Sequence, residues 1–98
     1  MRRDDAIRLL KEHEAEFRAL GVRALSLFGS TVRNEATSAS DVDLLVDFED
    51  GRRITLFGLS EVKFLAADLL GARADIAVHR DLRPAYREGI EAEAEKVF

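Results

Sequence analysis

Three aspartates carry the clearest chemical signal in this sequence. Asp41 and Asp43 open the apolar run DVDLLVDF, and Asp75 lies within the short apolar segment ADIAV. Residues two apart on a strand point to the same face with Cα atoms about 6.5–7 Å apart, so Asp41 and Asp43 project side by side. Their mutual repulsion can be relieved by water, by a neighbouring Arg or by a divalent cation. The spacing suits a divalent cation, since two-metal sites that act on phosphate hold their ions about 3.5–4 Å apart.

A single Asp-x-Asp pair is more often the solvent-facing start of a strand than a metal site. Asp75 adds weight to the metal hypothesis, because β propensity disfavours an Asp inside an apolar strand. If the strands carrying Asp43 and Asp75 are neighbours, the three acids form a cage of hard oxygen ligands, which Mg²⁺ prefers. The alternative for Asp75 is an edge strand that faces water. A calcium loop of the EF-hand kind is excluded, because Leu45 and Val46 stand where it needs an oxygen ligand and then Gly.

Gly29 and Ser30 form a second candidate site at the end of the apolar run VRALSLF. A glycine lets the backbone approach a phosphate closely, and Ser30 offers a hydroxyl and an N–H at the start of a possible helical turn, where anions bind well. Alone, such a pair is usually only a turn. It is neither a Walker P-loop nor a dinucleotide fingerprint, since the Gly-Lys of the first and the later glycines of the second are missing.

The elements expected to position these residues follow from the spacing of apolar residues. Short apolar runs bounded by turns predict strands over 22–28, 41–48 and 72–78. Helical spacing predicts helices over 4–20, over 56–70 and from Pro84 onward. The segment 31–40 is expected to form a helical turn and a loop. The order α-β-α-β-α-β-α predicts one α/β domain over residues 1–98, with helices packed on a short mixed sheet.

The same patterns predict which side chains are buried. On the second strand the side chains expected to face the core are Val42, Leu44, Val46 and Phe48. The last helix is expected to be lined by Tyr86, Ile90, Ala94 and Val97. Core packing is also the expectation for Phe57 and Phe64, with docking of a partner protein as the alternative for both and for Tyr86.

Composition excludes several classes of protein. With 98 residues, 47% of them hydrophobic and 35% charged, the chain has the make-up of one ordered globular domain. A net charge of −4 gives no general attraction to nucleic acid or to anionic lipid. The absence of Cys excludes disulfides and thiolate zinc sites. The apolar stretches are far shorter than the ~20 residues that cross a membrane, and we expect a cytoplasmic protein.

Taken together, GSTVRNEATSASDVDLLVDF resembles the signature of the DNA polymerase beta-like nucleotidyltransferases, in which Gly-Ser is followed by Asp-x-Asp in a strand and by a third Asp from a later strand. The short chain and the RADIAV strand look most like the minimal nucleotidyltransferases, the MntA-type antitoxins paired with HEPN-domain ribonuclease toxins. Asn34 departs from the family, which usually has Gly there. Because Asn tolerates a left-handed backbone, we expect the loop to be unchanged.

The resemblance implies transfer of AMP from ATP onto a hydroxyl, with pyrophosphate leaving. It implies two Mg²⁺ ions bound by Asp41, Asp43 and Asp75, with Asp75 also placed to accept the proton. It further implies that Gly29 and Ser30 cradle the terminal phosphates. Arg33 would neutralise phosphate charge, although an exposed loop arginine is an equal alternative for that position.

The acceptor is expected to come from a partner, because the chain carries no further domain to hold a second substrate. In the similar family the partner is the HEPN toxin, whose tyrosine is adenylylated and which is thereby neutralised within a hetero-oligomer. Two alternatives are a non-catalytic antitoxin that acts by stoichiometric binding and a nucleotidyltransferase with a small-molecule acceptor. The enzyme is favoured over binding alone, because a binding domain has no physical need to hold three mutually repelling acids together.

Overall fold

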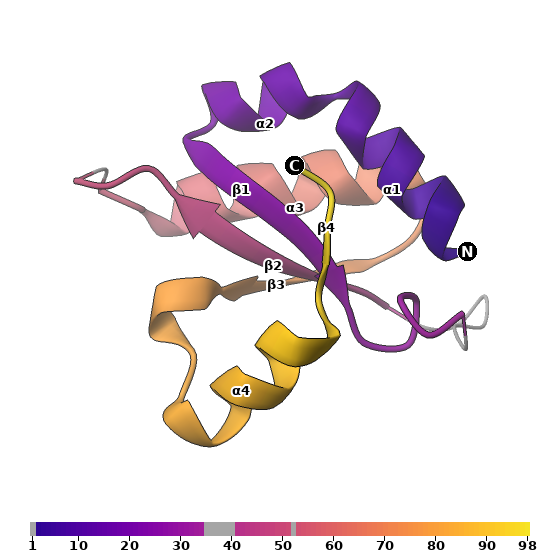
Figure 1. The fold of residues 1–98 in the computed structure, drawn as a ribbon. Coiled ribbons are helices and arrows are strands. Elements are labelled where there is room, and N and C mark those ends of the chain that lie inside the picture. The colour runs from indigo at the N-terminus through magenta and orange to yellow at the C-terminus, as the bar shows by residue number, and fades with distance from the viewer. Residues whose placement is uncertain (1, 35–40, 52) are drawn as a thin grey trace.

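Four strands form one mixed sheet in the spatial order β3-β2-β1-β4 (Figure 1). The computed structural model describes residues 2–34, 41–51 and 53–98. Its strands are β1 (Val22–Phe28), β2 (Val42–Phe48), β3 (Ala74–Val78) and β4 (Glu95–Lys96). β2 pairs antiparallel with β1 and parallel with β3, and β4 pairs antiparallel with the outer edge of β1. The predicted α/β fold with a short mixed sheet is therefore confirmed.

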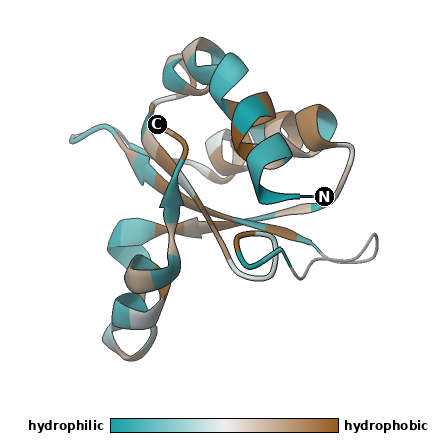
Figure 2. Cartoon of the chain, turned by 45° about the vertical axis from the view of Figure 1, so that its right-hand side comes forward, coloured by the Kyte–Doolittle hydropathy of each residue, from teal (hydrophilic) through white to brown (hydrophobic). Residues whose placement is uncertain are grey.

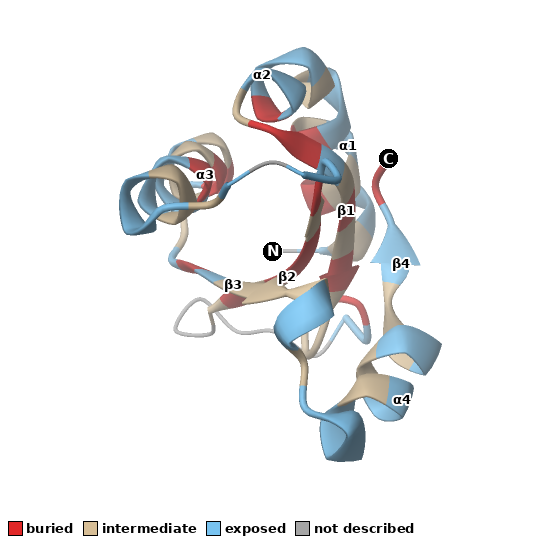
Figure 3. Cartoon of the chain, turned by 90° about the vertical axis from the view of Figure 1, so that its left-hand side faces the viewer, coloured by how far each residue is buried: buried red, intermediate tan, exposed pale blue. Residues whose placement is uncertain are grey.

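The helices cover the two faces of this sheet unequally. They are α1 (Arg3–Glu12), α2 (Glu14–Ala19), α3 (Leu56–Leu70) and α4 (Pro84–Glu93), with a 3₁₀ turn η1 at His79–Asp81. The first three helices lie on one face and α4 lies on the other (Figure 3). Within the described ranges of the chain, no helix is both long enough and apolar enough to cross a membrane.

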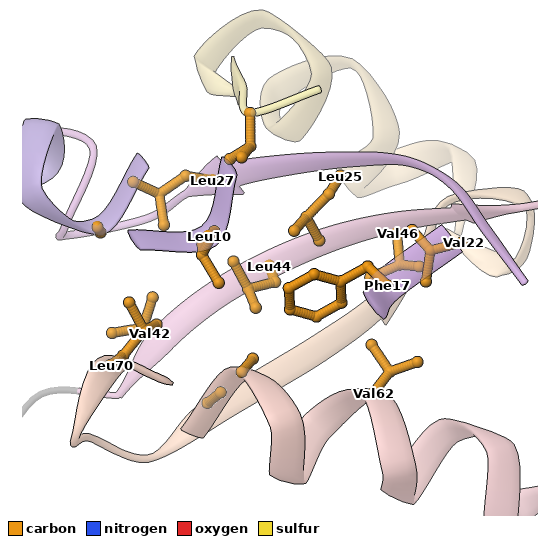
Figure 4. Close-up of a cluster of buried hydrophobic side chains, with 14 of the residues drawn as sticks. Leu10, Phe17, Val22, Leu25, Leu27, Val42, Leu44, Val46, Val62 and Leu70 are labelled. Carbon is orange, nitrogen blue, oxygen red and sulfur yellow. The ribbon is translucent and has the colours of Figure 1, made fainter. Parts of the chain in front are cut away.

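The core lies between the sheet and the layer formed by α1, α2 and α3 (Figure 4). Leu10, Phe17, Leu25, Leu44 and Val62 converge there from five different elements and have no exposed surface. The strand residues predicted to face inward, Val42, Leu44, Val46 and Phe48, are all buried as expected. Leu45 points to the other face of β2 and is also buried, so that face is not wholly open to water.

The first predicted helix is divided at His13. The backbone of His13 leaves the helical region at φ −112° and ψ 23°, and its carbonyl accepts hydrogen bonds from Glu16 and Phe17 at the start of α2. The His13 side chain also lies 2.6 Å from the Glu16 carboxylate. On both sides of this bend the helices bury apolar side chains, and their outer surfaces are mostly hydrophilic (Figure 2).

The prediction for the last helix is wrong beyond Glu93. Ala94 ends α4, and the chain then returns to the sheet as β4, so Val97 is buried on an extended segment and not on a helix. The unpaired edge of β1 explains the difference, because Val97 N–H donates to the Leu25 carbonyl at 2.8 Å and Leu25 N–H donates to Phe98. The Phe98 ring packs against Phe17 with centroids 6.2 Å apart.

The three aromatic side chains expected in the core are exposed instead. Phe57 is 83% exposed, Phe64 65% and Tyr86 63%. On α3 the buried positions are Val62, Ala66 and Leu70. Phe64 lies about 200° around the helix from Val62 at ~100° per residue, so it faces away from the core. On α4 no residue is buried at all, because this helix lies on the face of the sheet opposite the core (Figure 3).

Candidate active site

The parallel pairing of β2 with β3 brings the predicted acids together. Asp43 lies directly opposite Asp75 in the register of the two strands. On its other side, β2 pairs with β1 so that Asp43 lies opposite Phe28, the residue before Gly29. Asp41 immediately precedes β2. The start of β2, the start of β3 and the end of β1 thus meet at one end of the sheet, where all three acids and the Gly-Ser turn are found.

Gly29 is shaped to fit the carboxylate of Asp43. Its backbone has a φ of +79°, in the left-handed region that L-residues rarely adopt. A Cβ at this position would overlap Asp43 Oδ2 and would stand 3.1 Å from Asp43 Cγ. The glycine therefore leaves room for the central acid of the site, which is a reason for its presence that the sequence alone did not indicate.

Asp41 and Asp75 each face a basic side chain that the sequence did not single out. The Nε of Arg73 donates to Asp41 Oδ1 at 2.9 Å, and this hydrogen bond holds the pKa of Asp41 below its ordinary value. The Nζ of Lys63 lies 4.0 Å from Asp75 Oδ1. Arg73 stands two residues before Asp75 in the sequence. Its place beside an unexpected acid is the one feature of the sequence that could have indicated Arg73 as part of the site. Lys63 left no such signal, because it is brought near Asp75 only by the packing of α3 on β3.

Asp43 is the acid whose charge is least compensated. Burial raises its pKa above the ordinary value, and the negative charges of Asp75, Asp41 and Glu93 raise it further. The positive charge of Arg33 acts in the opposite direction but is the smallest of these influences. The ionised centre of the site therefore has a deficit of positive charge that a cation would relieve.

Arg33 lies at the rim of the site, in the turn that follows Gly29 and Ser30. It forms an ion pair with Glu93, the last residue of α4. Glu93 is a member of the site that the sequence could not indicate, because it is sixty positions away in the chain. This contact connects the predicted phosphate-binding turn to α4.

Asn34 closes the same turn in the way the sequence predicted. Its φ is 56°, which confirms the expected left-handed backbone, and its N–H donates to the Thr31 carbonyl at 3.0 Å. Its side chain does more than a glycine could, since Oδ1 accepts the backbone N–H of Arg3 at 2.9 Å. Arg3 begins α1, where the preceding Arg2 supplies no side-chain cap. Asn34 therefore caps α1 from a distant loop.

We expect Asn34→Ala to lower the free energy of unfolding by about 1–3 kcal/mol, since both the cap and the tolerance for left-handed backbone are lost. Asn34→Gly is the matched variant, because it keeps the backbone conformation and loses only the cap. Its expected loss is about 0.5–1 kcal/mol. Urea denaturation of both variants measures the difference, and equal losses would show that the left-handed backbone of Asn34 contributes nothing.

The donor set fits a hard divalent cation such as Mg²⁺. In the segments of the chain that the structure describes, no three acidic or His side chains stand close enough to hold an ion as they are placed. Asp41 is instead turned to Arg73, whose positive charge compensates the carboxylate as a metal ion would. Nevertheless, adjacent segments supply the carboxylate oxygens of Asp41, Asp43 and Asp75 as metal ligands. The negative charge of Asp43 is also the least compensated by neighbouring positive charge. These residues would hold the metal.

The fold is that of an α/β nucleotidyltransferase, and it brings the three predicted acids to one end of the sheet. The profile of the family described as "Nucleotidyltransferase domain" matches residues 9–97, and the chain belongs to this family of nucleotidyltransferase enzymes.

Relatives extend the comparison along most of the chain. The protein adenylyltransferase MntA of Thermococcus cleftensis is 42% identical over 76 residues, which are 76% of this chain and 75% of that protein. A solved structure assigned as a minimal nucleotidyltransferase has a TM-score of 0.80 at 38% identity, covering 97% of this chain and 95% of that chain. A chain from the complex of tri-AMPylated Shewanella oneidensis HEPN toxin with MNT antitoxin has a TM-score of 0.66, with 94% and 71% covered. At 15% identity that last similarity shows the fold alone.

Proposed function

We propose that this protein transfers AMP from ATP onto a tyrosine hydroxyl of a partner HEPN ribonuclease toxin and thereby acts as its antitoxin. The observation that carries the proposal is the register that sets Asp43 opposite Asp75 beside the Gly29 turn. It is supported by the 42% identical relative, which is named a protein adenylyltransferase, and by the fold shared with a HEPN–MNT complex. The reaction is proposed to take place in the cytoplasm.

Each part of the site has a role in this reaction. The backbone N–H groups of Gly29 and Ser30 would bind the terminal phosphates, and Arg33 would leave Glu93 to neutralise them. Asp41, Asp43 and Asp75 would hold two Mg²⁺ ions. When bound, the metal neutralises the triphosphate and lowers the pKa of the attacking hydroxyl.

The proposed step is a single displacement at the α-phosphorus of ATP. The acceptor oxygen forms a bond to that phosphorus while the bond to the bridging oxygen breaks, and pyrophosphate leaves with the electron pair. The hydroxyl proton passes to the Asp75 carboxylate. The rate comes mainly from positioning and charge stabilisation, because the protein itself forms no covalent bond in this chemistry.

The test is AMP transfer to the protein encoded next to this one. Purified protein is incubated with ATP labelled on the α-phosphate, Mg²⁺ and that neighbour. We expect label on the neighbour with the wild-type protein and none with the Asp41→Asn plus Asp43→Asn variant. Asp47→Asn is the matched control, because Asp47 lies on β2 outside the site and binds His79 at 2.9 Å.

Two outcomes would contradict the proposal. If the double variant neutralises the neighbour as well as the wild type and no label is transferred, the protein is an antitoxin that acts by binding. If label appears on a small molecule and never on the neighbour, the acceptor is not a protein. Label transfer by the Asp47→Asn control excludes a general effect of removing charge from β2.

A further inference from the structure

A pocket of about 420 Å³ lies between α3 and β3, and Asp41 and Asp75 are among the residues that line it. This volume is within the range of about 300–1,000 Å³ that is typical of small-molecule sites. Asp41 and Asp75 form its border with the reaction centre, and Lys63, Arg73 and Phe64 form much of the remaining wall. The pocket is thus continuous with the site, yet it contains none of the residues of the Gly-Ser turn.

We propose that this pocket receives the phenol ring of the acceptor tyrosine, and that Phe64, Lys63 and Arg73 form the wall that binds it. The inference rests on the proposed function and specifies its acceptor. It assigns a role to three side chains that lie outside the set of three acids and the phosphate-binding turn.

The order of the strands places the pocket on the side from which the acceptor must come. In phosphoryl transfer the attacking and leaving oxygens lie roughly in line on opposite sides of phosphorus. The Gly29 turn that would hold the leaving pyrophosphate follows β1, on one side of β2. The pocket opens on the other side of β2, beside Asp75 of β3. The acceptor oxygen therefore approaches from the pocket and meets the carboxylate that takes its proton.

The chemistry of the wall favours an aromatic alcohol. Phe64 is 65% exposed although it is a large apolar side chain, and a phenol ring stacked on it would cover that surface. Lys63 and Arg73 bring two positive charges to the same wall, where they pair with Asp75 and Asp41 in the metal-free protein. A phenol ionises near pH 10, far more readily than an aliphatic alcohol, so neighbouring cations stabilise its developing negative charge effectively.

The occupant of the pocket can be tested without any transfer reaction. N-acetyl-tyrosinamide and N-acetyl-serinamide are titrated by NMR into protein that carries Mg²⁺ and the unreactive α,β-methylene analogue of ATP. We expect the tyrosine compound alone to shift the signals of Ala67 and Ala74, which also line the pocket. Phe64→Ala should weaken its binding about tenfold, as expected for loss of an aromatic pair.

Phe57→Ala is the matched control for this titration. Phe57 lies on the same helix, is 83% exposed and is not among the residues that line the pocket. It should bind N-acetyl-tyrosinamide as the wild type does. Equal binding of the serine compound, or equal affinity in Phe64→Ala and the wild type, would overturn the proposal.

Steady-state kinetics separates failure of this inference from failure of the proposed function. With the labelled ATP assay and the neighbouring protein as acceptor, Phe64→Ala should raise KM for the acceptor and leave KM for ATP unchanged. If Phe64→Ala instead raised KM for ATP and left KM for the acceptor unchanged, the pocket would be assigned to adenine. That result would overturn the inference, while AMP transfer itself would stand. Absence of transfer by the wild type would remove the proposed function, and the binding titration would still report what the pocket accepts.

Discussion

Asp43→Asn is expected to reduce AMP transfer by about a thousandfold, as for loss of a key charge-stabilising group at an active site. The same change is expected to raise the melting temperature of the metal-free protein. Asn has nearly the shape of Asp but cannot bear the charge that binds a cation. Activity and stability should therefore move in opposite directions at this position.

The expected gain in stability follows from the raised pKa of Asp43. A carboxyl with a folded-state pKa above its ordinary value is destabilising when ionised, fully so at pH values above the folded pKa. That destabilisation is relieved as the pH falls through the folded pKa towards the ordinary value of 3.8. Like charges paired across strands destabilise by about 0.2–1 kcal/mol. Removing one of them should raise the melting temperature by about 1–5 °C in a domain of this size.

Thermal unfolding with EDTA at pH 7, together with the labelled ATP assay, measures both effects. Asp47→Asn serves again as the control, since it should keep transfer activity and lose stability with its His79 contact. Retained transfer in Asp43→Asn would remove Asp43 from the reaction. A loss of stability in Asp43→Asn would mean that the repulsion among the acids does not destabilise the metal-free fold.

Gly29→Ala is expected to lower AMP transfer by about a hundredfold and the free energy of unfolding by about 2 kcal/mol. Two causes act together. The left-handed backbone is unfavourable for Ala, and the new Cβ overlaps the Asp43 carboxylate, which must turn away from its place opposite Asp75.

Gly51→Ala separates these two causes. Gly51 has a φ of +76°, close to the +79° of Gly29, but a Cβ there meets no atom within 4 Å. It should lose about 1–2 kcal/mol through its backbone alone and keep full transfer activity. Chemical denaturation and the transfer assay are run on both variants. Equal loss of activity in the two would show that Gly29 acts only through stability.

The sequence predicted the parts of the fold that depend on local pattern. The alternation of acidic and apolar residues identified the side of β2 that faces the core. The apolar run ADIAV identified β3 despite the Asp within it. The left-handed Asn34 followed from the backbone preference of one residue type. The meeting of Asp43 with Asp75 could be stated only as a condition, because nothing local determines which strands become neighbours or in what register.

The remaining features depend on contacts between distant segments. β4 is only two residues long and has no period to detect, and it forms because the edge of β1 has unpaired backbone groups. Because β4 leaves no pattern in the sequence, apolar spacing predicts too long a last helix and does not connect Glu93 with the site. Lys63 and Phe64 could not be assigned for a similar reason, since their neighbours are set by how α3 packs on β3.

The parallel register of β2 and β3 has a consequence for how this chain can evolve. Side chains alternate along a strand, so a slip of β3 by one residue would set Ala74 or Ile76 opposite Asp43 and turn Asp75 to the other face. An insertion or deletion within the Gly71–Arg73 connection carries that risk, even if every acid is retained. We therefore expect a change in the length of this short connection to disrupt the site as much as replacement of one of its aspartates.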